Sequence, residues 1–252
     1  MPHVTFRFYA ELNDFLPRER RRQAFGRTVD RHSTVKDSIE SLGIPHPEVD
    51  LVTVNGRTVD FACRLSDGDR VAVYPRFHGI DPGSGARLSA ETPTPARFAT
   101  DVHLRQLAHR LRLAGFDTVE VADDADLARR ANDESRIALT RDRELLKRRI
   151  VGAGRWIRHT DPDAQLVEVL RHFELAAEVV PFTRCLRCNG RLEPVAKAHV
   201  LDRVPPGIPP LFDDFHQCPA CRRVYWRGTH FDRLERRLQH ALALAARRTP
   251  AV

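Results

Sequence analysis

Two pairs of cysteines have the spacing of metal ligands. Cys185-Leu-Arg-Cys188 and Cys218-Pro-Ala-Cys221 are CxxC pairs separated by 29 residues, and a Pro-rich segment at 205–210 takes up part of this interval. Two turns of this kind place four thiolates tetrahedrally around one Zn²⁺ and close the site to catalysis. A disulfide framework is disfavoured in a chain of this length that lacks an export signal. The sequence therefore predicts a structural zinc site.

Three aspartates stand where predicted strands end or a predicted helix begins. Asp101 and Asp142 each follow an apolar, strand-like segment, and Asp124 stands at the start of the helical segment between them. In parallel α/β sheets, ligands gather outside the carboxyl ends of the strands. Clustered carboxylates repel one another and become tolerable when a divalent cation neutralises them. We expect a Mg²⁺ or Mn²⁺ site on these acids, with Glu144 as a candidate fourth ligand, although an acid in such a position, taken alone, is most often a cap or part of a solvated turn.

Cations and aromatics follow the last cysteine pair in the segment 222–230. An aromatic ring can stack on an unpaired base while arginines follow the phosphate backbone. We therefore expect a single-stranded nucleic acid to contact Arg222, Arg223, Tyr225, Trp226 and His230. The alternative is that Tyr225 and Trp226 belong to the hydrophobic core around the zinc site.

A basic stripe runs along the helix expected after Asp101. Arg105, His109 and Arg112 lie at i, i+4 and i+7, opposite the leucines of that helix, and Arg141 stands beside Asp142. Arg105 and Arg112 are candidates for binding phosphates, and Arg141 is a candidate either for contacting the substrate or for pairing with an acid. A charged, solvated helix face explains the stripe equally well.

The positive charge of the chain is concentrated in its last quarter. The 252 residues carry a formal net charge of +7, and residues 181–252 hold 13 Lys and Arg against 6 Asp and Glu. The electrostatic footprint for a polyanion is therefore local. No apolar run approaches the roughly 18 residues that a membrane span needs, and the start of the chain lacks a signal-peptide pattern, so we expect a cytoplasmic protein without membrane contact.

Composition divides the chain into parts. Residues 79–96 are rich in Gly, Pro and Ser and are typical of a linker. Residues 1–78 contain, in order, a strand, a capped helix, a hairpin and a strand: Val4–Tyr9, Thr34–Gly43, Leu51–Val54 with Arg57–Asp60 around Asn55-Gly56, and Val71–Tyr74. This order resembles the ubiquitin-like β-grasp fold, particularly its small sulfur-carrier branch.

Sulfur carriers are activated at a free Gly-Gly terminus. Here His78-Gly79-Ile80 continues into more protein, so sulfur transfer would require processing after Gly79. We interpret residues 1–78 as a binding module for a protein partner rather than as a carrier.

After the linker, strands alternate with helices. The expected elements are strand Ala96–Asp101, a helix on Leu104, Leu107, Ala108, Leu111 and Ala114 up to Gly115, strand Thr118–Val121, helix 126–132 and strand Ile137–Thr140. Such alternation predicts a parallel α/β sheet over 97–180. The region 181–252 adds the cysteine pairs and a final helix from about Asp232.

Three segments carry a resemblance to a known family. Arg97–Thr118, Asp124–Ala131 and Arg136–Asp142 resemble the Mut7-C ribonuclease domain, a relative of the PIN-like nucleases, and the match extends over most of 97–233. It implies an α/β PIN-like parallel-sheet domain with an appended four-cysteine zinc ribbon, preceded in some bacterial members by a ubiquitin-like domain. The motif from Tyr225 to His230 resembles the family's YW-x-G-[ST]-H signature.

The resemblance implies a metal-dependent ribonuclease. Its acids fall on Asp101, Asp124 and Asp142 and would bind Mg²⁺ or Mn²⁺ for phosphodiester hydrolysis, with Asp123 as an alternative for the second. Val102-His103 stands where relatives often carry another acid or amide. The zinc ribbon would aid RNA binding. The alternative from another class is a non-catalytic RNA- or ribosome-associated adaptor, in which the acids are structural.

Overall fold

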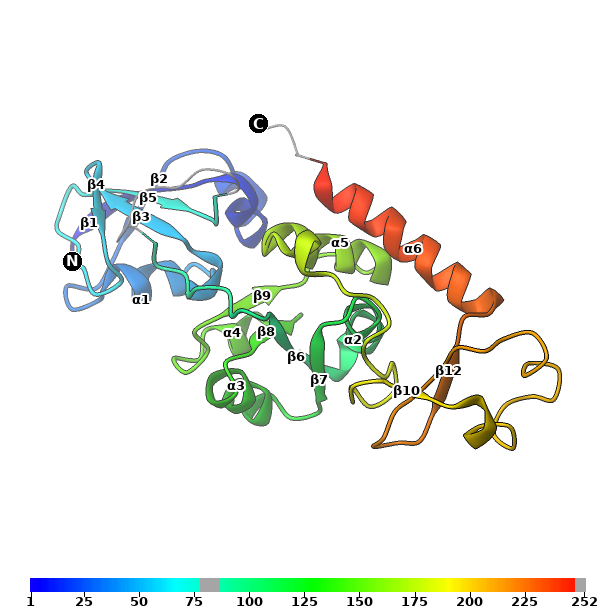
Figure 1. Cartoon of the computed structure of the whole chain (residues 1–252). Coiled ribbons are helices and arrows are strands. Elements are labelled where there is room, and N and C mark those ends of the chain that lie inside the picture. Colours follow the sequence, from blue (N-terminus) through cyan, green and yellow to red (C-terminus); the bar gives the residue numbers. More distant parts are fainter. Residues whose placement is uncertain (78–86, 248–252) are drawn as a thin grey trace. The chain divides into compact units, whose positions relative to one another are not determined.

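The computed structural model describes residues 1–77 and 87–247, which form two compact units (Figure 1). The first unit comprises Met1–Pro93 with Asp123–Trp156, and the second comprises Thr94–Ala122 with Ile157–Thr249. Gly79, the terminus that a sulfur carrier would need, lies outside the described residues. None of the helices in the described part is long and apolar enough to cross a membrane.

The first unit contains a five-stranded sheet with the order β2-β1-β5-β3-β4. The strands and the helix that packs on them are β1 His3–Phe8, β2 Phe25–Thr28, α1 Val35–Glu40, β3 Leu51–Val54, β4 Arg57–Val59 and β5 Arg70–Tyr74. The central strands β1 and β5 are parallel, and the other neighbours are antiparallel. This arrangement is the predicted β-grasp fold.

Along β1, every second side chain is buried and contributes to the core under this sheet. Val4, Phe6 and Phe8 are buried and share one cluster with Val35 and Ile39 of α1, as expected where successive strand residues point to opposite faces. Local signals fix the ends of the elements. Thr34 and Asp37 form a capping box at the start of α1, and Asn55-Gly56 turns between β3 and β4 with positive φ at both residues.

Part of the predicted linker lies against this core. Leu88 packs on the apolar cluster, and its backbone N–H donates to the carbonyl of Asp50 at 2.7 Å. The Asp50 carboxylate, which is fully buried, pairs with Arg87 at 3.4 Å and accepts a hydrogen bond from the Ser89 hydroxyl. Residues 87–89 therefore extend the β-grasp unit.

Four further elements complete the first unit: α3 Asp124–Asp133, β8 Ile137–Thr140, α4 Arg143–Leu146 and β9 Gly154–Trp156. β8 and β9 are parallel, with Thr140 opposite Trp156. The sequence predicted α3 and β8. It missed α4 and β9, because these segments are too short to show a period.

The second unit holds a further pair of parallel strands and the longest helices. Its elements are β6 Arg97–Asp101, α2 Arg105–Leu113, β7 Asp117–Val121, α5 Pro162–His172 and α6 Thr229–Ala246. β6 and β7 are parallel, and α6 packs along α5 (Figure 1). The predicted apolar face of α2 is buried at Leu107, Ala108 and Leu111. The predicted class, a parallel sheet with helices, is confirmed.

The cysteine region forms an antiparallel sheet of three short strands, β10 Glu193–Val195, β11 Phe215–Gln217 and β12 Val224–Trp226. Its core is small: Val200, Val204 and Phe215 are buried, and Trp226 packs against them. Short 3₁₀ helices occur at Ala10–Phe15, Arg18–Arg20, His46–Glu48, Val102–Leu104, Leu175–Glu178 and Lys197–His199. α6 begins at Thr229, slightly earlier than the expected Asp232.

Gly115 lies between α2 and β7 and packs against the segment Val180–Thr183 that enters the cysteine region. It has φ +99°, and a Cβ there would collide with the Val180 carbonyl oxygen and lie 3.0 Å from Thr183 Oγ1. We expect Gly115→Ala to lower the free energy of unfolding by about 2 kcal/mol or more, since the strained backbone and the clash add. Gly152→Ala is the control, because a Cβ there meets no atom within 4 Å. Equal urea midpoints for the two variants would contradict this prediction.

Candidate functional site: a four-cysteine metal centre and separate acidic side chains

The four cysteines come together as the spacing predicts. Their sulfur atoms all lie within 4.8 Å of one another. Cys185 Sγ is 3.5 Å from Cys221 Sγ, and Cys188 Sγ is 3.4 Å from Cys218 Sγ. Tetrahedral Zn–S bonds of about 2.3 Å place neighbouring sulfurs about 3.8 Å apart. The donor set and its dimensions therefore fit a zinc ion.

The two cysteine pairs form matching turns. The N–H of Cys185 donates to the carbonyl of Gly190 at 2.8 Å, and the N–H of Cys218 donates to that of Arg223 at 3.0 Å. Each first cysteine also accepts a hydrogen bond at its carbonyl, from the N–H of Asn189 in one turn and of Arg222 in the other. Asn189 and Arg222 both have positive φ, 69° and 63°. The backbone thus aims the thiols at one point without a regular sheet or helix.

Gly190 leaves room for the sulfur atoms. A Cβ at this position would lie 2.9 Å from Cys218 Sγ and 3.7 Å from Cys188 Sγ. The first distance is shorter than a carbon–sulfur contact tolerates, so a larger residue would push the two cysteine turns apart.

Tyr225 acts on the metal centre through one of its ligands. Its hydroxyl lies 3.2 Å from Cys185 Sγ, and it accepts a hydrogen bond from the N–H of Leu186 at 3.1 Å. Burial raises the pKa of Cys185, but the hydrogen bonds from Tyr225 and neighbouring groups outweigh it and lower this pKa to about 6. The O–H donor therefore stabilises the thiolate that a metal requires.

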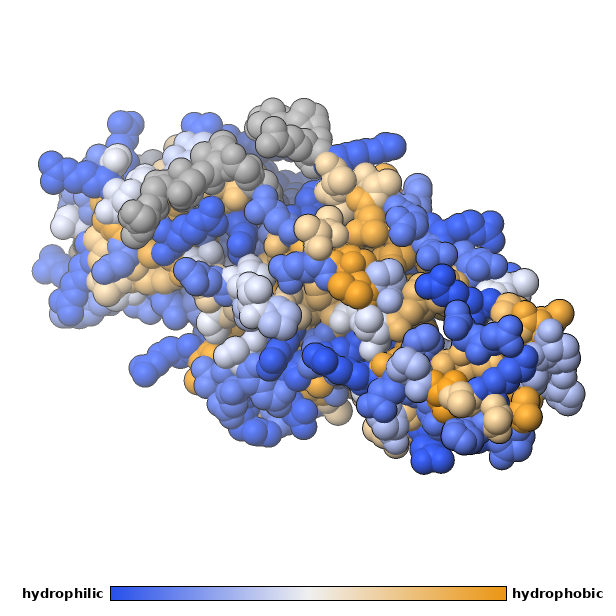
Figure 2. Space-filling view, viewed as in Figure 1, coloured by the Kyte–Doolittle hydropathy of each residue, from blue (hydrophilic) through white to orange (hydrophobic). Residues whose placement is uncertain are grey.

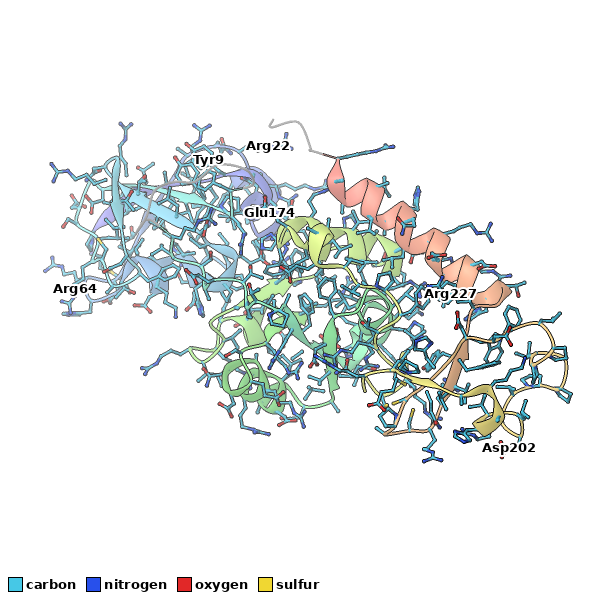
Figure 3. The ribbon with its side chains drawn as sticks, viewed as in Figure 1. Tyr9, Arg22, Arg64, Glu174, Asp202 and Arg227 are labelled. Atoms are coloured by element: carbon cyan, nitrogen blue, oxygen red, sulfur yellow. The ribbon has the colours of Figure 1, made fainter. Side chains whose placement is uncertain are left out.

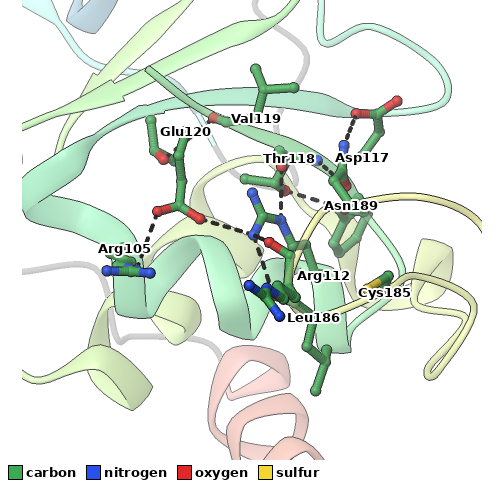
Figure 4. Close-up of polar contacts among 12 residues, drawn as sticks. Arg105, Arg112, Asp117, Thr118, Val119, Glu120, Cys185, Leu186 and Asn189 are labelled. Carbon is green, nitrogen blue, oxygen red and sulfur yellow. Dashed lines mark hydrogen bonds and ion pairs between the residues drawn. The ribbon is translucent and has the colours of Figure 1, made fainter. Parts of the chain in front are cut away.

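The first cysteine turn is held against α2 and β7 (Figure 4). The Asn189 side chain accepts from the N–H of Thr118 at 3.0 Å and donates to Asp117 Oδ1 at 2.8 Å. The Arg112 guanidinium donates to the carbonyls of Leu186 and Arg187 at 3.2 and 3.3 Å. The metal centre is therefore fixed to the end of β7 that follows α2.

Arg112 differs from the expectation of a phosphate-binding residue. It is 4% exposed, and its guanidinium also donates to the Thr118 carbonyl at 2.9 Å and to Glu120 at 2.8 Å. The cysteine turn covers this end of the helix face, so we assign Arg112 a structural role. Arg105, on the same face, has an 83% exposed side chain and reaches Glu120 at 3.7 Å (Figure 4).

Asp101 ends strand β6 and caps the turn that follows. Its Oδ1 accepts hydrogen bonds from the N–H groups of His103 and Leu104 at 2.8 and 3.1 Å. The residue is 7% exposed. A carboxylate held by two backbone donors at the end of a strand has a defined orientation.

Asp124 and Asp142 stand at the starts of α3 and α4. Asp142 Oδ1 accepts from the N–H of Glu144 at 2.8 Å, which makes Asp142 the N-cap of α4. Asp123, the alternative for the second acid, is the N-cap of α3 and binds the N–H of Asp126. Asp124 is exposed and, among the described residues, its side chain makes no hydrogen bond or ion pair. Asp101 belongs to one compact unit and Asp124 and Asp142 to the other, so their convergence stays a prediction.

The remaining candidate residues fall into two groups. Arg141, Arg222, Arg223 and His230 are exposed or partly exposed, as a phosphate-binding role requires. Trp226 is half-buried against the small core of the ribbon and lies 6.5 Å from the Phe215 ring. The sequence missed a cavity of about 1300 Å³ beside it, which is lined by residues of α2, the ribbon and α6. The aromatic side chains of Phe182 and Phe231 were the available signal in the sequence.

Together these features define a protein with a ubiquitin-like domain, parallel α/β pairs and a cysteine-rich metal centre. The Mut7-C RNase domain model matches residues 96–238, more than half of the chain, and the Mut7-C ubiquitin model matches residues 1–81. The chain belongs to the Mut7-C RNase domain family. Membership indicates a ribonuclease, and the four clustered cysteines are able to bind a metal such as zinc.

Solved structures similar to this chain cover the ubiquitin-like part. One is the small archaeal modifier protein 1 of Haloferax volcanii, with 18% identity, 31% of this chain and 100% of that chain covered, and a TM-score of 0.26. Another is a putative molybdopterin converting factor subunit 1 from Pyrococcus furiosus, with 22% identity, coverage of 31% and 100%, and a TM-score of 0.25. No curated protein matches the chain.

Removing the hydroxyl of Tyr225 tests its action on the metal centre. We expect Tyr225→Phe to weaken zinc binding by about 10-fold or more, since outer-shell hydrogen bonds to metal ligands have effects of this size. Competition with a chromogenic chelator measures the affinity. Tyr9→Phe, which removes a hydroxyl from the β-grasp domain, is the control. Equal zinc affinities in the two variants would exclude a role for the Tyr225 hydroxyl.

A methyl group at Gly190 tests the space around the sulfurs. Gly190→Ala is expected to lower the zinc content of the purified protein and to destabilise the ribbon, because the new Cβ would overlap Cys218 Sγ. Gly207→Ala, also in the cysteine region, places its Cβ in open space and should retain one zinc per chain by elemental analysis. Full zinc occupancy in Gly190→Ala would show that the turns tolerate the overlap.

Proposed function

We propose that this protein is a metal-dependent ribonuclease that hydrolyses RNA phosphodiester bonds at Asp101, Asp124 and Asp142. Family membership supports the ribonuclease class. The observation that carries the choice of residues is the placement of the acids. Asp101 ends the parallel strand β6, and Asp142 follows the parallel strand β8 by two residues, at the strand ends where α/β sheets bind ligands.

The carboxylates suit a hard divalent cation. Asp124 is exposed and unpaired among the described residues, and Asp142 is exposed with its Oδ2 free of hydrogen bonds there. Mg²⁺ and Mn²⁺ are bound by a few carboxylates and keep several waters, so they do not need an enclosed cage. Such an ion, when bound, supplies a water of lowered pKa and neutralises charge on the scissile phosphate. The aspartates hold the ion, and the backbone N–H donors that orient Asp101 and Asp142 keep them ready for it.

RNA affinity would come from the ribbon cavity. Its walls carry Phe182 and Phe231, whose rings stack with centroids 3.7 Å apart. The guanidinium of Arg227, the residue labelled beside the cysteine region in Figure 3, lies 5.1 Å from the centre of the Phe231 ring. Hydrophobic residues are visible on the surface of the cysteine region in Figure 2. An unpaired base stacks on such rings while cations bind its phosphates.

The cations around this cavity are arginines. Arg223 and Arg227 line it and are exposed, as is His230. Burial, followed by the charges of Arg110 and Arg112, lowers the pKa of His109, so the charged form of this imidazole is disfavoured. The proposed RNA surface consists of Arg222, Arg223, Arg227, Trp226 and His230, with Arg105 and Arg141 as exposed contacts elsewhere. Binding through these cations should weaken steeply with salt.

Cleavage of end-labelled RNA in the presence of Mn²⁺, Mg²⁺ or EDTA tests the proposed chemistry. Asp142→Asn is expected to reduce kcat by about 100-fold or more, because it removes a charged ligand of the catalytic ion. Asp133→Asn, an exposed acid at the end of α3, is the control and should cleave normally. Wild type and both variants must carry equal zinc. RNA binding without cleavage under every metal would favour the adaptor instead, since the basic ribbon would then be the functional part.

A further inference from the structure

A carboxylate of the ubiquitin-like domain is buried against strand β9. Glu48 lies in the 3₁₀ helix His46–Glu48, and its side chain is fully buried. Its Oε2 pairs with the Arg155 guanidinium at 2.7 Å, and its Oε1 accepts the backbone N–H of Trp156 at 2.6 Å. A buried carboxylate is costly unless both oxygens find donors. Here residues of β9 provide them.

Other contacts join the same two segments. Glu11 of the β-grasp domain approaches the Arg155 guanidinium at 3.6 Å. The His46 ring contacts the carbonyl of Val151 through Nε2 at 2.9 Å and Glu40 through Nδ1 at 2.7 Å. β9 and the loop before it are therefore fixed by the ubiquitin-like domain at several points.

Trp156 also contacts the residues on either side of Asp142. Its indole N–H donates to the carbonyl of Arg141 at 3.2 Å. The Arg143 guanidinium lies 4.1 Å from the centre of the Trp156 ring and 4.9 Å from that of Phe15, and the two rings are 5.0 Å apart. Cation–π contacts of this geometry restrict a long arginine side chain.

Asp142 stands between the two residues that Trp156 contacts. Its N–H donates to the Thr140 hydroxyl at 2.9 Å, and its carboxylate caps α4. Thr140 is also the residue opposite Trp156 in the parallel β8–β9 pair. The direction of the Asp142 carboxylate thus depends on a turn in which the residues before and after Asp142, Arg141 and Arg143, both contact Trp156.

We propose that the ubiquitin-like domain is a built-in support of the nuclease site, in which Glu48 and Trp156 are positioning residues for Asp142. The inference rests on the proposed function for the role of Asp142 as a metal ligand. Neither residue touches the substrate. Glu48 holds Trp156, and Trp156 holds the turn from Arg141 to Arg143.

Two conservative variants and one matched control test the support. Trp156→Phe keeps a ring for Phe15 and Arg143 but removes the indole donor, and Glu48→Gln removes the charge that pairs with Arg155. Glu19→Gln changes an exposed glutamate of the same domain, whose side chain makes no hydrogen bond or ion pair in the described residues. Thermal unfolding of the zinc-loaded full chain checks that all three are folded.

The first measurement is amide hydrogen exchange over residues 141–147. We expect exchange to be faster by about 3- to 10-fold in Trp156→Phe and Glu48→Gln, the size expected when one hydrogen bond is lost, and unchanged in Glu19→Gln. Exchange equal to that of Glu19→Gln in both variants would overturn the proposal. This readout does not depend on catalysis.

The second measurement separates positioning from general stability. Mn²⁺ affinity, followed by the loss of the free-ion EPR signal, should fall by about 3- to 10-fold in both variants, and kcat should fall with it while KM for RNA stays unchanged. A wild type that neither binds Mn²⁺ nor cleaves RNA would reject the proposed function, while faster exchange in the variants would still support the attachment. Normal Mn²⁺ affinity and kcat in both variants, with an active wild type, would overturn the positioning role.

Discussion

A charge removed from water must be paired, and Glu48 and Arg112 are buried charges that lie where segments distant in sequence meet. Glu48 pairs with Arg155 across 107 residues of sequence. Arg112 binds Glu120 and the carbonyls of Leu186 and Arg187, which are 74 and 75 residues further along the chain. Truncating one partner of such a pair leaves an uncompensated charge, so these contacts specify which segments associate more than they add net stability.

In the cysteine region, the charges that need a partner would be those of the four thiolates, and the partner would be a metal ion. Its apolar core is small, with Val200, Val204 and Phe215 buried, and its short strands bury little surface. Four thiolates repel one another unless a cation neutralises them, and a zinc ion bound there would contribute folding free energy that the small core does not supply. Arg112 and Asn189 join the first cysteine turn directly to α2 and β7. A turn that is ordered therefore also restrains these two elements.

Local signals allowed much of the fold to be predicted, whereas tertiary contacts decided the rest. Some signals depend only on residues close together in the sequence, and these have the predicted structure. They are the Asn55-Gly56 turn, the buried leucines of α2 and the turn within each CxxC pair. Helical spacing placed Arg112 on an exposed face, but the cysteine turn covers that face. Tyr225 has a type suited to base stacking, yet its hydroxyl binds a cysteine 40 residues away. Residue type and spacing contain no information about such partners.

Under the proposed function, RNA binding and cleavage would be supported by different contacts in this protein. The proposed RNA cavity is lined by the ribbon, α2 and α6, and a metal bound by the four cysteines would stabilise the ribbon part of this lining. The turn that carries Asp142 depends instead on Trp156 and, through it, on Glu48 of the ubiquitin-like domain. If the proposal holds, the affinity for RNA and the rate of RNA cleavage would change independently. A ubiquitin-like domain that supports a metal ligand needs no free carboxyl terminus, because its sheet and the 3₁₀ helix carrying Glu48 do the supporting.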